Sequence, residues 1–431
     1  MASIIDLSEP RILPLNVVGE LSARDLRVLE RVARIESVPG RGLRLTAKAR
    51  FAGRASLSSL DLWIPPSCGV YESAMMSLIH HGVSPEALSR VPLVATNPFG
   101  SLPGIEPLLA QCLVSQVDEV RKSHVAQAYE HRTERRQVLR GRPVWSSPLV
   151  MQPPGSILTR FFEKTTDTLP NMLLVAGLDR AVRVLRYSGA ASEARRQLAT
   201  WSGLAQPQSV SWRDFDLALD KLDRRTGHYR DALLAARSLI FGVSDSRREH
   251  EIPGAFTDLA ILFESLLKAL LRVALSPTEL AVVAQVRDRE AFRTADGSKY
   301  LEPRADLEVR QSDEVVTVID AKYKPNYCEY GPDVQESNRI SSSDLFQMAV
   351  YGLSRLPAGR QRHVFIVAPQ LGKGLPPSRR NREINFEYGS MMPVQITLVP
   401  LPVRDAVRAV ATSDIELAQK LVQPILTHVK S

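Results

Sequence analysis

The amino-acid sequence predicts an α+β protein with several domains, and three observations lead to that prediction. The chain has 431 residues, which is too long for one ordinary hydrophobic core. Apolar residues recur with a helical period through the middle of the chain, but from Tyr300 onward they alternate with a period of two. Polar or proline-rich segments at 150–155 and 244–253 interrupt these patterns. We therefore expect a β-rich and helical N-terminal domain (1–150), a helical region (151–250) and a C-terminal α/β domain with a mixed sheet (251–431).

The N-terminal domain is expected to combine helices with strands. Ser22–Arg34 carries apolar residues on one face and starts with a serine that can cap a helix. Gly42–Pro65 contains alternating runs, which predict strands separated by the Ala-Gly-Arg at 52–54. A long helix is expected from about Ile105 to Val138, because a glycine and a proline follow it only at positions 141 and 143.

Helices are predicted through the middle of the chain, and strands dominate after it. The expected helices are Asn171–Tyr187, Ser192–Trp201, Asp214–Ile240 and Phe256–Leu275. The expected C-terminal strands are Ala305–Arg310, Glu314–Tyr323, His363–Ala368 and Val394–Leu401. A helix at Ser343–Leu356 separates the second strand from the third, and another helix follows the last strand.

Composition argues against a membrane protein and against a disulfide-rich protein, but it does not identify a partner. The net charge of +8 permits a polyanionic partner but does not require one. The apolar segment Leu259–Leu275 is interrupted by three charged residues, and the N-terminus lacks the pattern of a secretion signal, so no membrane partner is expected. Three cysteines without a CxxC pair support neither disulfides nor a cysteine zinc site. We expect a soluble, cytoplasmic protein.

Two acidic residues and a lysine form the pattern that carries chemistry. The buried strand Glu314–Tyr323 ends in Asp320 and Lys322, which share one face of the sheet. If the preceding strand pairs with it as a hairpin about Asp313, Asp306 lies across from Asp320. Two carboxylates so close repel each other unless a divalent cation lies between them. The sequence therefore predicts a site for Mg²⁺, which prefers carboxylate oxygens.

Lys322 would orient or help to deprotonate a water molecule and would neutralise charge on a reacting phosphate. Asp306, followed about fourteen residues later by Asp320-x-Lys322, is the pattern of PD-(D/E)xK nucleases. An ion pair at the end of a strand is the simpler interpretation of Asp-x-Lys alone.

Two flanking helices offer further candidates. Glu264 lies on the apolar helix upstream, where it is either a surface glutamate or a group beside the metal. Downstream, Asp344, Gln347 and Tyr351 fall on one helix face, so that Gln347 could face the phosphate, whereas Tyr351 fits core packing better.

These residues resemble the McrC family, the nuclease subunit of McrBC-type modification-dependent restriction systems. The resemblance rests on DAKYK at 320–324 and DLFQMAVYG at 344–352, with weaker matches at Tyr129, at VLRGR 138–142, at TDTLPNMLL 166–174 and at LFESLLKALL 262–271. The proline of the family's Pro-Asp motif is replaced here by Ala305, which leaves the carboxylate of Asp306 in place.

The resemblance implies a PD-(D/E)xK domain that cuts double-stranded DNA, modified for example by 5-methylcytosine, with Asp306, Asp320 and Glu264 as metal ligands. It also implies a partner, a hexameric AAA+ GTPase or ATPase, which residues 1–150 would bind and stimulate. Consistently, the chain has no GxxxxGK[ST] motif, so we expect it to bind no nucleotide. Arg140 and Arg142 are either contacts to that ring or structural residues.

Two alternatives stay open. The chain could be a catalytically silent adaptor that stimulates its AAA+ partner, or a stand-alone PD-(D/E)xK nuclease. No recognisable DNA-reading module is present to support the second. If the nuclease interpretation holds, the two halves are expected to be separable, so that deleting residues 1–150 leaves the nuclease fold intact.

Overall fold

The protein is described here by a computed structural model. It describes residues 3–57, 60–89, 105–144, 156–186, 188–206, 209–241, 255–287, 292–293, 299–301, 304–324, 327, 340–357, 361–371, 382–386 and 393–430. The segments expected to interrupt the chain at 150–155 and 244–253 lie outside these residues.

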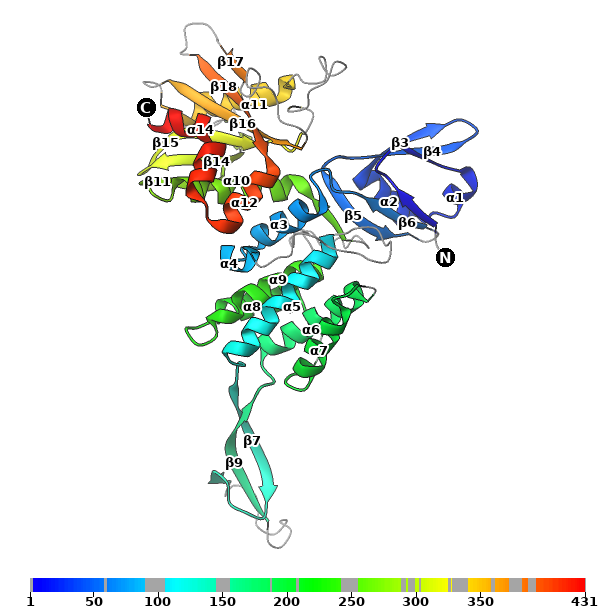
Figure 1. Ribbon diagram of the computed structural model, residues 1–431, viewed down its shortest axis with the longest axis vertical. Coiled ribbons are helices and arrows are strands. Elements are labelled where there is room, and N and C mark those ends of the chain that lie inside the picture. The colour runs from blue at the N-terminus through cyan, green and yellow to red at the C-terminus, as the bar shows by residue number, and fades with distance from the viewer. Residues whose placement is uncertain are drawn as a thin grey trace. The chain divides into compact units, whose positions relative to one another are not determined.

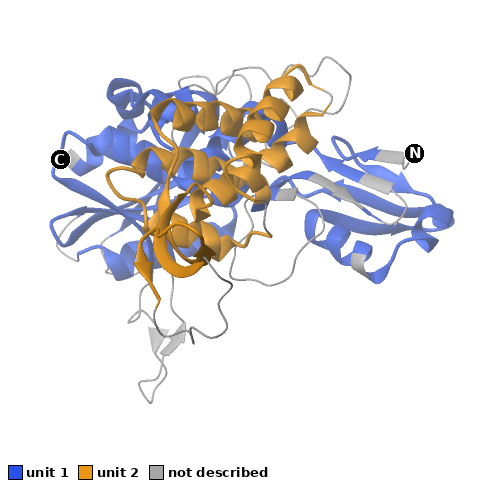
Figure 2. Cartoon of the chain, turned by 90° about the horizontal axis from the view of Figure 1, so that it is seen from below, with its two compact units in different colours: residues 1–95, 102–108, 241–431 blue, residues 96–101, 109–240 orange. Residues whose placement is uncertain are grey.

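The chain forms two compact units (Figure 2). Unit 1 comprises residues 1–95, 102–108 and 241–431, and unit 2 comprises residues 96–101 and 109–240. The three predicted domains, 1–150, 151–250 and 251–431, stay a prediction.

The predicted N-terminal helix is confirmed as α2 (Ala23–Val32). Ser22 caps it, since its side chain accepts a hydrogen bond from the backbone N–H of Asp25, whose carboxylate accepts one from the backbone N–H of Ser22. The apolar face of α2 packs on a three-stranded sheet, β2 (Arg11–Leu13), β4 (Gly42–Ala47) and β3 (Ala33–Val38). Helix α1 (Leu15–Gly19) lies between β2 and α2 in the sequence.

A second N-terminal sheet has the order β1 (Ser3–Asp6), β6 (Leu60–Ile64), β5 (Phe51–Ser56) and β10 (Ala255–Asp258). The predicted turn at 52–54 is wrong, because these residues belong to β5 and the chain turns instead at 48–50, where the Phe51 N–H donates to the Lys48 carbonyl. The predicted start of a helix at Phe256 is also wrong, since β10 pairs with β5 and the helix begins only at Leu259.

A mixed six-stranded sheet forms the C-terminal part of unit 1, as predicted (Figure 1). Its order is β11 (Leu280–Arg287), β14 (Arg304–Gln311), β15 (Glu314–Ala321), β16 (Arg362–Gln370), β18 (Val394–Pro402) and β17 (Arg382–Phe386). Strands β15, β16 and β18 are parallel to one another, and the other pairs are antiparallel. A separate short pair consists of β12 (Phe292–Arg293) and β13 (Lys299–Leu301).

Helices pack on this sheet from two sides. Lys322 and Tyr323 directly follow β15, and their side chains point to opposite faces, as alternate residues of an extended chain do. Lys322 contacts Gln347 on α11 (Ser342–Arg355), whereas Tyr323 contacts Phe263 on α10 (Leu259–Leu275). Helix α10 also packs against α3 (Val70–His81), α12 (Val403–Thr412) and α13 (Ile415–Leu421). Helices α4 (Pro85–Ser89) and α14 (Gln423–Lys430) complete unit 1.

Unit 2 consists of helices and one small sheet. The helices are α5 (Ile105–Ser123), whose first turn lies in unit 1, and α6 (Leu169–Leu185), α7 (Ala191–Ser202), α8 (Trp212–Asp220) and α9 (Arg230–Phe241). The single helix predicted over 214–240 is therefore divided, and a 3₁₀ turn (Gly227–Tyr229) precedes α9.

The long helix predicted to reach Val138 ends at Ser123. The chain continues as β7 (Ala128–Arg136), which pairs with β9 (Ile157–Thr165) and, through β9, with β8 (Arg142–Pro143). Every residue of β7 is exposed or half-buried, so the strand has no alternation of apolar and polar residues that could reveal it.

Among the described residues, no helix is long and apolar enough to cross a membrane.

Candidate active site

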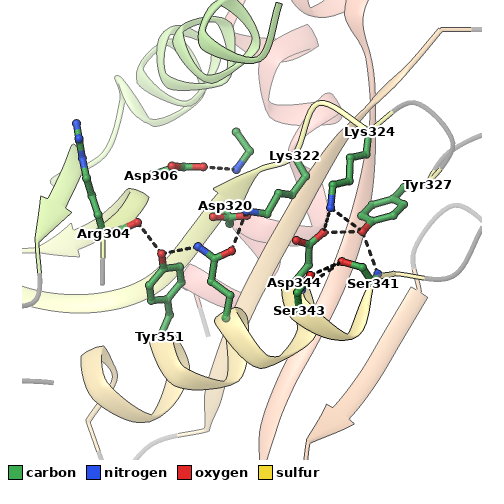
Figure 3. A network of polar contacts seen from close by, with 12 residues as sticks. Arg304, Asp306, Asp320, Lys322, Lys324, Tyr327, Ser341, Ser343, Asp344 and Tyr351 are labelled. Carbon is green, nitrogen blue, oxygen red and sulfur yellow. Dashed lines mark hydrogen bonds and ion pairs between the residues drawn. The ribbon is translucent and has the colours of Figure 1, made fainter. Parts of the chain in front are cut away.

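Near the acids, the hairpin of β14 and β15 has the register that the sequence predicts. The pairing is shifted by one residue at the turn, where Gln311 pairs with Glu314, and an irregularity between Val309 and Arg310 accounts for the shift. Leu307 pairs with Ile319 and Glu308 pairs with Val318, so the same register carried one residue further places Asp306 opposite Asp320. The two acids meet at the end of the hairpin (Figure 3). Asp306 Oδ2 accepts a hydrogen bond of 2.9 Å from the backbone N–H of Ala321, next to Asp320.

Both carboxyl groups lie in an environment that disfavours their charge. Asp320 is 1% exposed. Burial raises the pKa of Asp306 to about 8, and the nearby carboxylates of Asp320 and Glu264 contribute to the shift. Burial also raises the pKa of Asp320, although the Lys322 ammonium opposes it. Two acids with raised pKa values facing each other are the situation that a bound cation relieves.

Lys322 completes the site beside these acids. Its Nζ lies 2.7 Å from Asp320 Oδ2 as an ion pair and donates a hydrogen bond of 2.9 Å to Gln347 Oε1. Burial alone would lower the pKa of Lys322, but the carboxylate of Asp320, together with those of Asp344 and Asp306, raises it overall. Lys322 is therefore a cation in this arrangement and acts as a hydrogen-bond donor.

Helix α11 fixes the glutamine that contacts Lys322. The Gln347 amide nitrogen donates to the Tyr351 hydroxyl over 2.7 Å, and this hydroxyl donates to the carbonyl of Arg304 at the start of β14 over 2.6 Å. Tyr351 is buried, as core packing predicts, but its hydroxyl also belongs to the polar network (Figure 3). The network orients the amide oxygen of Gln347 toward Lys322.

A second polar cluster lies at the N-terminus of α11. Asp344 Oδ2 accepts hydrogen bonds from Lys324 Nζ over 2.6 Å and from the Tyr327 hydroxyl over 2.5 Å. Burial would raise the pKa of Asp344, but these hydrogen bonds lower it overall. Tyr327 also accepts from the backbone N–H of Ser341, which caps α11. The cluster ties the chain after β15 to the start of α11.

Glu264 approaches from α10. Its carboxylate accepts a hydrogen bond from the side chain of Gln285 on β11. Burial raises the pKa of Glu264, while the Gln285 hydrogen bond and then the charges of Arg304 and Lys268 oppose the shift. Glu264 is thus half-buried and lies within electrostatic range of Asp306 and Asp320.

The residues present fit a hard cation held by two carboxylates. Mg²⁺ commonly takes one or two protein carboxylates and completes its shell with water. Asp320 Oδ2 is buried and accepts no aligned hydrogen bond, although Lys322 Nζ is close to it. Within the described part of the chain, no three His, Cys, Asp or Glu side chains are grouped closely enough to hold a metal together. Glu264 as a third ligand therefore stays a prediction.

The structure thus brings together four predicted residues: Asp306, Asp320, Lys322 and Gln347. Glu264 contacts Gln285 on β11, the strand that pairs with β14. Sequence reasoning missed Gln285, Lys324 and Tyr327. Lys324 belongs to the DAKYK segment, but nothing in the sequence around it indicates that its side chain contacts Asp344. The pattern of apolar residues around Gln285 gives no indication that its side chain reaches Glu264.

The two arginines considered as ring contacts lie in unit 2. The guanidinium of Arg140 lies over the ring of Phe161, 4.7 Å from its centroid, and 3.6 Å from Glu163 Oε1. Arg142 is exposed, and it lies opposite Arg160 in the pairing of strands β8 and β9. Arg140 has a structural role in the small sheet, while its half-exposed side chain still reaches solvent.

A family model described as the McrBC 5-methylcytosine restriction system component matches residues 103–364, more than half of the chain. The fold is similar to a chain in a half-complex from a tetradecameric assembly of Thermococcus gammatolerans McrB AAA+ hexamers with bound McrC, with a TM-score of 0.66 and 14% identity over 98% of this chain and 100% of that one. A chain in the cryo-EM structure of the Thermococcus gammatolerans McrBC complex aligns with a TM-score of 0.43 and 13% identity, over 63% of this chain and 88% of that one. No curated protein sequence matches.

Proposed function

The chain belongs to the McrBC 5-methylcytosine restriction system component family, and from this we propose that it is the Mg²⁺-dependent DNA endonuclease subunit, of McrC type, in such a system. It would hydrolyse phosphodiester bonds in double-stranded, modified DNA. One observation carries the proposal: the buried Asp320 and the half-buried Asp306 face each other across a hairpin, with a protonated lysine 2.7 Å from Asp320.

In this proposal each residue has a distinct role. Asp306 and Asp320 would hold Mg²⁺, with Glu264 as the candidate third ligand. When bound, the ion would supply charge stabilisation to the phosphate and acidify a water molecule. Lys322, held by Gln347, would donate a hydrogen bond to the attacking water or to a phosphate oxygen where negative charge develops.

The partner is proposed to be a hexameric AAA+ GTPase or ATPase. This chain is similar in fold to a chain of an assembly in which McrC is bound to McrB AAA+ hexamers. The absence of a phosphate-binding GxxxxGK[ST] motif supports a division of labour, in which the partner hydrolyses the nucleotide. We expect the system to act in the cytoplasm, where DNA and nucleoside triphosphates are available.

The β7–β9 hairpin is the surface that we propose for contact with the ring. Among its residues, Tyr129 and Phe162 are 72% and 66% exposed, and Val138 in the turn that follows β7 is 76% exposed. Exposed aromatic residues among arginines are typical of protein interfaces. The hairpin lies within the matched residues 103–364.

Cleavage of a methylated and an unmethylated duplex tests the proposal. The chain is assayed with and without an AAA+ partner of the McrB type, with GTP or ATP, and with Mg²⁺ or EDTA. We expect cleavage that requires the partner, its nucleotide and Mg²⁺ together.

The other outcomes identify the alternatives. Efficient cutting by the chain alone would point to a stand-alone nuclease. Stimulation of the partner's nucleotide hydrolysis without any cutting, under conditions where Mg²⁺ is saturating, would point to the silent adaptor.

A further inference from the structure

The backbone of β11 is irregular at the position that faces the acid pair. Ala284 pairs with Leu307 and Val286 pairs with Ala305, so Gln285 lies opposite Asp306 but forms no ladder pair. Its φ is +57°, in the left-handed region that residues with a side chain rarely adopt. The strand resumes its regular register immediately after this residue.

The irregularity gives the Gln285 side chain a partner outside the sheet. Its amide nitrogen donates to Glu264 Oε1 on α10. An irregular residue that bends a strand can re-aim one side chain without disturbing the pairing on either side. A residue held in an unfavourable conformation at a site of this kind is a reason to look for a function of its side chain.

Ser312 shows that a strained backbone is not by itself a sign of function. It has φ of +55° in the turn between β14 and β15, it is exposed, and it lies at the opposite end of the hairpin from Asp306 and Asp320. Gln285 differs because its side chain is half-buried and contacts a carboxylate that influences both acids.

We propose that Gln285 is a positioning residue that fixes the rotamer of Glu264, the candidate third ligand, within electrostatic range of Asp306 and Asp320. This inference rests on the proposed nuclease function. A carboxylate on the half-buried face of a helix can adopt several rotamers, and one hydrogen bond from a fixed amide selects among them. Residues that orient metal ligands in this way commonly change metal affinity or activity by about 10- to 100-fold when mutated.

Two substitutions separate the side chain from the backbone. Gln285→Ala removes the amide and keeps the strained conformation, whereas Gln285→Gly removes the amide and relieves the strain. Both variants should bind Mn²⁺ about tenfold more weakly by calorimetry and should cut DNA about tenfold more slowly in the full complex. The melting temperature of Gln285→Gly should nevertheless exceed that of Gln285→Ala. A merely structural role would instead make activity follow stability.

Ser312→Gly is the matched control, since it relieves the same strain away from the site. It should raise the melting temperature and leave Mn²⁺ affinity and cutting unchanged. Combining Gln285→Gly with Glu264→Gln should cost no more than Glu264→Gln alone, because both changes remove one function.

Wild-type Mn²⁺ affinity in Gln285→Gly, or losses that multiply in the double variant, would overturn the inference. If the wild-type complex binds Mn²⁺ without cutting, the nuclease proposal fails, while the role of Gln285 is still decided by the affinities. A wild-type chain that neither binds Mn²⁺ nor cuts would refute both.

Discussion

At the scale of single residues, the central feature is a pair of acids that stability alone does not explain. Asp306 and Asp320 repel each other in a buried setting, and a neutral side chain at either position would remove that repulsion. Glu308, on the same strand as Asp306, is fully buried but is neutralised by Arg310 and Arg355 at 2.7 Å. The structure therefore compensates Glu308 with two arginines, whereas Asp320 is paired with one lysine, Lys322, and still faces the carboxyl group of Asp306.

The metal-free protein should lose stability as pH rises. The folded-state pKa of Asp306 is about 8, against 3.8 ordinarily, so between these values the folded protein holds a proton that the unfolded chain releases. The free energy of unfolding then falls by up to about 1.4 kcal/mol per pH unit from this group. Asp306→Asn should flatten this dependence and stabilise the metal-free protein at pH 8, as measured by urea unfolding in EDTA. An unchanged slope would contradict the assignment.

Lys322 should matter for chemistry more than for binding. Lys322→Gln keeps a hydrogen-bond donor but removes the charge, and it should slow cleavage by about 100-fold or more while DNA affinity changes little. Gln347→Ala only releases the lysine from its anchor, so its loss should be smaller, about tenfold. Single-turnover rates at saturating DNA distinguish the two, and equal losses would mean that the charge of Lys322 is not the important property.

Much of this site could be predicted from residue spacing. Alternation and a centre of symmetry near Asp313 placed Asp306 opposite Asp320, but they did not predict the irregularity between Val309 and Arg310 that gives the hairpin this register at the acids. Gln285 could not be found in that way, because a left-handed glutamine inside a strand leaves no trace in a pattern of apolar residues. Tyr327 was likewise hidden, since its partner Asp344 follows it by 17 residues.

At the scale of elements, the link between α10 and the N-terminal sheet is the least expected feature. Asp258 ends β10 and caps α10, with Oδ1 accepting from the N–H of Ala260 over 3.0 Å, and Arg50 on the N-terminal side forms an ion pair with it. The N–H of Leu259 donates to the carbonyl of Arg50 over 2.7 Å. The helix that carries Glu264 thus starts from the N-terminal sheet.

The cap and the ion pair can be separated by substitution. Asp258→Ala removes both and should lower the free energy of unfolding by about 1–2 kcal/mol. Asp258→Asn keeps a capping oxygen and loses only the pairing with a half-exposed arginine, so it should cost less than about 1 kcal/mol. Urea unfolding of both variants measures the difference, and equal costs would show that the charge rather than the cap stabilises this junction.

The elements that sequence patterns failed to predict share a physical cause. Strand β7 is exposed on both faces, so its charged residues continued the pattern of the preceding helix. Strand β10 has only four residues and is a strand because β5 pairs with it from some 200 positions away. The strands of the large sheet were predictable because burial imposes an apolar pattern on them.

At the scale of the whole molecule, the contacts within unit 1 argue against the expectation that the nuclease fold stays intact without residues 1–150. Strand β5 pairs with β10, and α3 packs on α10. The Tyr323 hydroxyl, one residue after Lys322, bonds to Ser67 Oγ over 2.7 Å. The N-terminal segment is therefore part of the unit that holds the acid pair.

Two deletions should behave in opposite ways. A fragment of residues 241–431 lacks β5 and α3 and should fail to give a cooperative unfolding transition. Replacing the hairpin between Ala128 and Thr165 by a short linker should keep the unfolding transition of unit 1 and its Mn²⁺ affinity, while stimulation of the AAA+ partner is lost. Calorimetry measures the unfolding transition and the Mn²⁺ affinity, and a nucleotide-hydrolysis assay measures stimulation of the partner. A 241–431 fragment that folds and binds Mn²⁺ would contradict the description of unit 1.

The most direct test of the account is one substitution measured in two assays. Asp320→Asn preserves the shape of a buried side chain and removes the charge that would bind Mg²⁺. In the complex with the AAA+ partner, we predict that cleavage of methylated DNA falls by about 100-fold or more, while stimulation of nucleotide hydrolysis stays at the wild-type level. Cleavage at the wild-type rate by Asp320→Asn would contradict the assignment of the active site.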